Sequence, residues 1–119
     1  MEDSLPMLSP AQVNDTMRRL RDALTALFPD EAMDIILYGS YARGDAEPGS
    51  DLDVMILTDA SREEISKRKW DISGIGFDLS LSCGVIVSIF VENRTFFRTL
   101  LPALPFFRNV SKEGVRYYG

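Results

Sequence analysis

Hydrophobic side chains recur every three or four positions between residues 10 and 27, and this spacing predicts an amphipathic helix. The stripe consists of Val13, Met17, Leu20, Leu24 and Leu27. Ser9 followed by Pro10 is typical of a helix N-cap with proline at the first helical position. The segment 28–30 contains the proline that ends the pattern. We therefore expect one helix here, with one apolar face.

Three short apolar runs further along the chain are better explained as strands. They cover residues 34–38, 52–57 and 85–91, and turn-forming residues separate them. Ser61, with two glutamates in the turn that follows it, predicts the start of a helix that runs to about Ser82. Because Gly74 and Gly76 weaken this helix, we expect it to bend or split there.

The C-terminal third of the sequence predicts two more short helices, at 92–100 and 106–113, with Gly114 ending the second. The aromatic tail at 115–118 either docks on the chain's own core or forms part of an interface. The order of elements predicts an α/β (α+β) fold, a small mixed β-sheet flanked by helices. A length of 119 residues predicts a single domain over residues 1–119.

The amino-acid composition excludes several classes of function. Thirteen basic against 18 acidic residues give a net charge of −5, which argues against strong binding to nucleic acid. The absence of histidine excludes a Ser-His-Asp triad and a His-ligated zinc site. A single cysteine, Cys83, and the lack of a signal peptide favour a reducing, cytoplasmic setting. No apolar run approaches the roughly 18 residues that would span a membrane.

The stretch GSYARGDAEPGSDLD, residues 39–53, has the features of a site. Asp51 and Asp53 are two residues apart, so on a strand both carboxylates project from the same side and repel each other. Mg²⁺ would remove the repulsion and complete its ligand shell with water and phosphate oxygens. Gly39 permits close approach of a ligand, backbone N–H groups favour phosphate oxygens, and Ser40 adds a hydroxyl. The stretch therefore predicts a site for a metal-bound polyphosphate.

These residues resemble a known signature. GSYARG followed by SDLDV, with ten residues between Ser40 and Asp51, looks like the motif of the nucleotidyltransferase superfamily related to DNA polymerase beta. The sequence is most similar to the minimal nucleotidyltransferase family. The resemblance implies a mixed sheet flanked by helices. It also implies transfer of a nucleoside monophosphate from a nucleoside triphosphate, such as ATP, to a hydroxyl with the help of two metal ions.

The resemblance also assigns roles to residues. Asp51 and Asp53 would be the catalytic residues and the Mg²⁺ ligands. The nucleotide would be bound by Gly39, Ser40, Arg43 and Ser50, although Arg43 equally fits a surface ion pair. Members of the family are often paired with a HEPN-domain protein as antitoxin to toxin. The expected partners are therefore a nucleoside triphosphate and either a HEPN-domain protein or further copies of the chain.

One position departs from the family pattern. The family carries a third carboxylate on a later strand, and in this chain the corresponding position is Ser88, a poor metal ligand and a poor base. Glu92 shares its strand face but lies about 13 Å further along at ~3.3 Å per residue. Asp78 is better explained as an exposed or capping acid. Loss of this ligand would lower the rate by several orders of magnitude.

Two hypotheses remain at this stage. The first is a Mg²⁺-dependent nucleotidyltransferase that adenylylates a hydroxyl of a protein or a small molecule. The second is a catalytically degenerate nucleotide-binding protein that masks a HEPN-type partner. The intact Gly-Ser and Asp-x-Asp elements favour the enzyme. Ser88, together with the short chain and its lack of a second substrate-recognition domain, favours the binding role.

Overall fold

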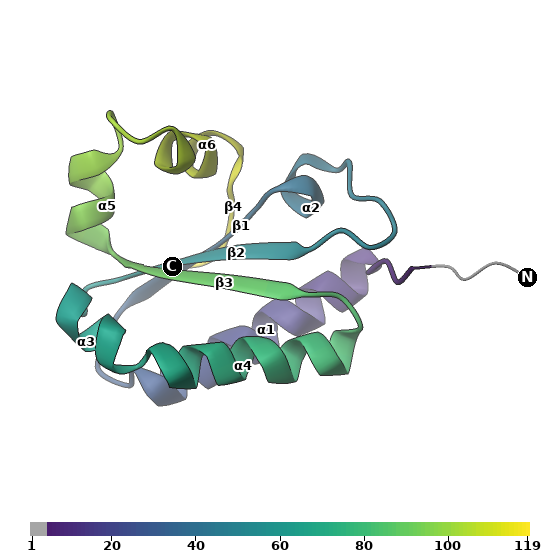
Figure 1. The fold of residues 1–119 in the computed structure, drawn as a ribbon, viewed down its shortest axis with the longest axis horizontal. Helices are drawn as coiled ribbons and strands as arrows, with labels where there is room; N and C mark the ends of the chain where they lie inside the picture. The colour runs from purple at the N-terminus through teal and green to yellow at the C-terminus, as the bar shows by residue number, and fades with distance from the viewer. Residues whose placement is uncertain (1–4) are drawn as a thin grey trace, which may run out of the picture.

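A four-stranded mixed β-sheet organises the chain in the computed structural model, which describes residues 5–119 (Figure 1). The strands are β1 (Met33–Tyr38), β2 (Leu52–Thr58), β3 (Val87–Asn93) and β4 (Val115–Tyr118), in the order β3-β2-β1-β4. Strand β1 runs antiparallel to both β2 and β4, whereas β2 and β3 are parallel. Residues 1–4 of the predicted single domain lie outside the described part.

Helices cover both faces of this sheet (Figure 1). The two long helices α1 (Pro10–Leu27) and α4 (Lys69–Cys83) lie on one face. The shorter α5 (Arg94–Leu100) and α6 (Pro105–Glu113) lie on the other, on the same side as the single turn α2 (Ser40–Arg43). Helix α3 (Arg62–Lys67) precedes α4. The predicted α/β fold with a mixed sheet flanked by helices is confirmed. Between residues 5 and 119, no helix combines the length and the apolar character needed to cross a bilayer.

The first helix forms as the pattern predicts. Ser9 accepts a hydrogen bond from the backbone N–H of Gln12, and the Gln12 side chain accepts one from the Ser9 N–H, which completes a capping box. Of the predicted stripe, Val13, Met17, Leu20 and Leu24 are buried. Leu27, at the end of the helix, is only partly buried against the same core.

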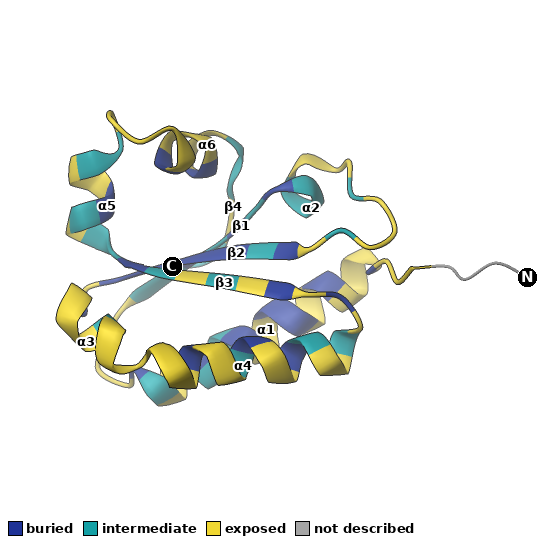
Figure 2. Ribbon diagram, in the orientation of Figure 1, coloured by how far each residue is buried: buried dark blue, intermediate teal, exposed yellow. Residues whose placement is uncertain are grey.

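The side chains along each strand contribute in turn to two hydrophobic clusters, because successive side chains point to opposite faces of the sheet. Ile35, Leu37, Val54 and Ile56 join the cluster that α1 and α4 cover. Met55 and Leu57 point the other way and pack with three residues of the short C-terminal helices: Phe97, Phe107 and Val110. Burial of both faces accounts for the nearly continuous apolar sequence of β2, whose interior is dark blue in Figure 2.

The predicted break in the long helix is at another position. The helix starts after Ser61, whose side chain accepts from the Glu64 N–H at 3.1 Å, as predicted. It divides at Arg68, whereas α4 runs uninterrupted through Gly74 and Gly76. A Cβ added at Gly76 would lie 3.3 Å from the Val87 carbonyl oxygen, so this glycine lets α4 approach β3 closely.

Two predictions on the second half of the chain need correction. Strand β3 spans 87–93, two residues later than the run 85–91 suggests, and the expected helix at 92 begins only at Arg94. The tail forms β4, an edge strand beside β1, so it docks on the chain's own sheet. Trp70 and Phe77 are 78% and 63% exposed, so neither packs in the core.

Candidate functional site

A row of three polar residues crosses the sheet near the end of β1. Tyr38 of β1 pairs with Asp53 of β2, and Asp53 pairs with Ser88 of β3. Directly opposite residues of neighbouring strands point to the same face, which here is the face that carries α5 and α6. The position that the sequence analysis marked as lacking a carboxylate is therefore the nearest neighbour of Asp53 on β3.

Asp53 lies directly against the bend between β1 and α2. Gly39 forms this bend with φ at +77°, a backbone conformation that favours glycine. A Cβ at Gly39 would lie only 2.4 Å from Oδ2 of Asp53, so the carboxylate occupies the space that any other residue would fill. The structure thus brings Gly39 and Asp53 together. Asp51 lies exposed one residue before β2 begins.

Asp53 has more negative than positive side chains around it. Burial raises the pKa of its carboxyl, the negative charges of Asp51 and Glu113 raise it further, and Arg43 lowers it. Burial and the charge of Asp53 together raise the pKa of Tyr38 to about 12, so this phenol is neutral at pH 7. A raised carboxyl pKa means that the folded chain binds the Asp53 proton more tightly than the unfolded chain does.

Ionised Asp53 therefore lowers the stability of the fold at pH 7, and we expect Asp53→Asn to raise it. The gain should be about 0.5 kcal/mol, because Asp53 is only half-buried. This corresponds to about 2–4 °C in the melting temperature. The gain should shrink as the pH falls and Asp53 becomes protonated in the wild type. Calorimetry of the metal-free protein tests this, with the exposed Asp78→Asn as control; an unchanged or lower melting temperature for Asp53→Asn would contradict it.

Glu113, at the end of α6, is part of the site although the sequence analysis did not identify it. Its Oε1 accepts a hydrogen bond from the Gly39 N–H at 3.1 Å. The same carboxylate accepts from Nη1 of Arg43 at 3.2 and 3.3 Å. Arg43 also donates from Nε to Asp45 at 3.2 Å. The structure thus shows Arg43 in an ion pair, and nucleotide binding by Arg43 stays a prediction. No local pattern marks Glu113, which is 74 residues from Gly39 and reaches it only because α6 packs on the sheet.

The two serines of the motif lie at opposite ends of its loop. Ser40 opens α2, and its carbonyl oxygen accepts from the N–H groups of Gly44 and Asp45 at 3.0 and 3.1 Å. Ser50 closes the turn before β2: its hydroxyl accepts from the Glu47 N–H, and its own N–H donates to the Glu47 carbonyl, both at 2.9 Å. Nucleotide binding by Ser40 and Ser50 stays a prediction.

The donor set fits a hard divalent cation that is shared with a phosphate. Asp51 and Asp53 offer carboxylate oxygens, and their mutual repulsion is what a cation would relieve. Within residues 5–119, no three acidic or thiol side chains are grouped to hold an ion by themselves. Mg²⁺ suits such a site because it keeps several waters and binds one or two carboxylates together with substrate phosphates.

Neither alternative third acid is available at the site. Glu92 is 5% exposed, and its carboxylate accepts from Nε of Arg62 at 3.2 Å and from the Asn93 N–H at 2.8 Å. It therefore stabilises the far end of β3. Asp78 is exposed on α4, which covers the opposite face of the sheet. Both residues are structural or surface acids in this fold.

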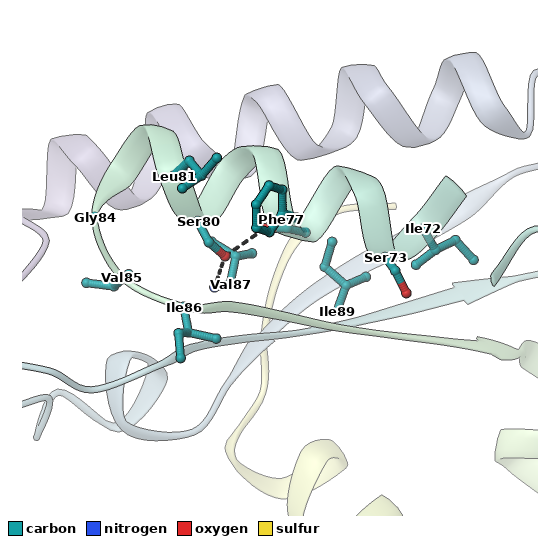
Figure 3. A pocket seen from close by; sticks show the side chains of 11 residues that line it. Ile72, Ser73, Phe77, Ser80, Leu81, Gly84, Val85, Ile86, Val87 and Ile89 are labelled. Carbon is teal, nitrogen blue, oxygen red and sulfur yellow. Dashed lines mark hydrogen bonds between the residues drawn. The ribbon is translucent and has the colours of Figure 1, made fainter. Parts of the chain in front are cut away.

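A separate apolar cavity of about 570 Å³ lies between α4 and β3 (Figure 3). Its lining includes three exposed apolar residues: Phe77 and Leu81 of α4, and Ile86 just before β3. On its inner wall, Ser80 donates to the Gly76 carbonyl and accepts from the Val87 N–H. It shares no residue with the Gly39–Asp53 site, because α4 packs on the other face of the sheet. Its volume therefore says nothing about the chemistry of that site.

Sequence comparison places this geometry in a family. The family model described as nucleotidyltransferase domain matches residues 17–118. "Putative protein adenylyltransferase MJ0604" of Methanocaldococcus jannaschii is 32% identical over 93 residues, which cover 78% of this chain and 85% of the relative. "Putative protein adenylyltransferase MJ0141" of the same organism is 29% identical over 84 residues, or 71% and 83% of the two chains.

Two crystal structures share the fold. One is a toxin–antitoxin with AMP-PNP, with a TM-score of 0.58 and 19% identity, covering 87% of this chain and 73% of that one. The other is a mutant of the toxin–antitoxin MntA-HpeT, with a TM-score of 0.53 and 20% identity, covering 95% and 74%. Likeness at this level of identity concerns the fold alone. With the family model matching all four strands, the chain belongs to the nucleotidyltransferase domain family, as a member of its minimal nucleotidyltransferase branch.

Proposed function

We propose that this chain transfers an adenylyl group from ATP to a hydroxyl of a partner protein, with Mg²⁺ held by Asp51 and Asp53. In this reaction the hydroxyl oxygen forms a bond to the α-phosphorus of ATP. The bond from that phosphorus to the bridging oxygen breaks, and pyrophosphate leaves. The hydroxyl proton passes to solvent, since Ser88 offers no carboxylate beside Asp53.

The observation that carries the proposal is the contact between Asp53 and the Gly39 bend. A phosphate that approaches the backbone at Gly39 comes within reach of a cation bound to Asp53. The first N–H groups of α2, from Ser40 and Tyr41, have no acceptor within the helix, because every helix leaves its first N–H groups unpaired. Two relatives named as protein adenylyltransferases support ATP as the donor and a protein as the acceptor.

A binding role is the second candidate, and Ser88 favours it. Loss of one metal ligand weakens the activation of the attacking hydroxyl more than it weakens nucleotide binding. Under this alternative, the chain binds ATP and masks a HEPN-type partner without modifying it. The two toxin–antitoxin structures that share the fold support a partner protein under either proposal.

Labelled ATP separates the two candidates. The full chain is incubated with Mg²⁺, ATP labelled at the α-phosphate and the product of the neighbouring gene. We expect slow transfer of label to that product, and at least a tenfold lower rate with Asp53→Ala. Asp78→Ala removes an exposed acid from the opposite face and should transfer at the wild-type rate. Tight partner binding that survives Asp53→Ala, with no label transferred by any variant, would instead support masking.

A further inference from the structure

The chain places one of its own carboxylates on groups that attract phosphate. Glu113 accepts from a backbone N–H at Gly39 and from the guanidinium of Arg43, two donors of the kind that bind phosphate oxygens. This contact does not depend on a helix dipole, because α2 is only four residues long. The Glu113 carboxylate is thus an anion of the protein itself, bound by donors that also suit a phosphate.

We propose that Glu113 is an autoinhibitory residue: its carboxylate occupies the contacts with Gly39 and Arg43 that a phosphate of ATP takes, so ATP must displace it. The inference rests on the proposed function, because it concerns the same site. It goes further by assigning a regulatory role to the end of α6. ATP bound with Glu113 in its present position would bring phosphate charge next to the Glu113 carboxylate, and like charges at such short range repel.

The local electrostatics allow Glu113 to leave. Arg43 and the Gly39 N–H attract the Glu113 carboxylate. The negative charges of Glu113 and Asp53 repel each other, and this repulsion raises the pKa of the Asp53 carboxyl. A phosphate accompanied by Mg²⁺ would bring its own cation toward Asp53 and remove that repulsion. The Glu113 side chain is 26% exposed, so it can turn toward solvent without crossing the core.

The backbone beneath Glu113 is fixed, so the movement is confined to its side chain. A Cβ at the next residue, Gly114, would lie 2.4 Å from the Val110 carbonyl oxygen and 2.6 Å from Cγ2 of Ile36. This close packing ties the end of α6 to β1. The following residue, Val115, already pairs with Leu37 in the sheet. Displacement of Glu113 is therefore a rotamer change, without movement of α6.

Calorimetric titration of the full chain with ATP and Mg²⁺ tests the proposal. Glu113→Ala should bind ATP about tenfold more tightly than wild type. Glu113→Gln, which keeps the size of the side chain, should lie between the two. The matched control is Asp45→Ala, which removes the same charge and the other acid on Arg43 but leaves Glu113 in place; its affinity should stay within about threefold of wild type. Equal or weaker binding by Glu113→Ala overturns the proposal.

The backbone amide of Gly39 provides a second readout by ¹⁵N NMR. Its resonance should move when ATP is added to wild type and should start from a displaced position in Glu113→Ala. If ATP moves this resonance in wild type but Glu113→Ala binds ATP no more tightly, the autoinhibitory role is wrong and the proposed function stands. If no variant binds ATP, the proposed function fails, and inorganic tripolyphosphate decides the role of Glu113. A larger Gly39 response to tripolyphosphate in Glu113→Ala than in wild type supports it, and an equal or absent response overturns it.

Discussion

Ser88→Asp should raise the rate of adenylyl transfer about 100-fold at saturating Mg²⁺, the size of effect typical of a positioned acid–base group. Ser88 pairs with Asp53 and points to the same face of the sheet. It is exposed, so an aspartate fits there without repacking the core. The new carboxylate would supply the ligand that the resemblance to DNA polymerase beta-like nucleotidyltransferases implies and this chain lacks. Transfer of α-labelled ATP to the partner protein measures the rate.

Stability provides an independent check on the same variant. Two aspartates directly opposite on neighbouring strands repel each other, so without metal Ser88→Asp should melt at a lower temperature than wild type. Mg²⁺ should restore the melting temperature of Ser88→Asp more than that of wild type. Ser88→Asn has a similar shape and no charge, and it should show neither effect. A Ser88→Asp protein that responds to Mg²⁺ as wild type does, and transfers at the wild-type rate, would show that the missing acid is not what limits this site.

Gly39→Ala should weaken the binding of ATP with Mg²⁺ about 100-fold, or about 2.7 kcal/mol, the size of effect expected when a contact with a charged group is lost. The new methyl group would lie 2.4 Å from Oδ2 of Asp53, and the aspartate is the flexible partner, so its carboxylate must move. Displacement of Asp53 separates the proposed metal ligand from the bend that would hold the phosphates. Titration calorimetry measures the affinity, and thermal denaturation measures the accompanying loss of stability.

Gly44→Ala is the control for a positive φ, because nothing lies within 4 Å of the missing Cβ of Gly44. Its φ is +82°, against +77° for Gly39. The ψ angles differ: −158° at Gly39 and 15° at Gly44. Gly44→Ala should lose about 1–2 kcal/mol of folding free energy to the left-handed conformation. Gly39→Ala should lose about 1–3 kcal/mol, because its φ and ψ fall in a region that is essentially restricted to glycine. Only Gly39→Ala should also lose ATP affinity. Equal affinities for the two variants would mean that the contact between Gly39 and Asp53 does not matter for binding.

Periodicity determined most of the local structure. The helix from Pro10 and the strands around Ile35 and Val54 form where the sequence predicts them, because cap residues and apolar spacing act within one or two turns of chain. The same local logic brought Gly39 and Asp53 into one prediction, since a turn and the strand that follows it are close in sequence. The resemblance to the nucleotidyltransferase family also identified Ser88 as the position of interest on the third strand.

Tertiary packing decided what the sequence could not show. The tail becomes strand β4 only because β1 has a free edge for it. Helix α4 continues through Gly76 because it needs a glycine where it meets β3, so contact with the sheet outweighs weak helix propensity. Gly74 makes no such contact and lies within the same helix.

Polar contacts between residues far apart in the sequence could not be predicted for the same reason. Arg94 joins Asp34 and Asp59, which precede it by 60 and 35 residues, and Glu113 reaches Gly39 across 74. A pattern read along the chain reports neighbours within a few residues. These contacts form between segments that only the folded sheet brings together, so the acid that occupies the proposed nucleotide site was visible only in the structure.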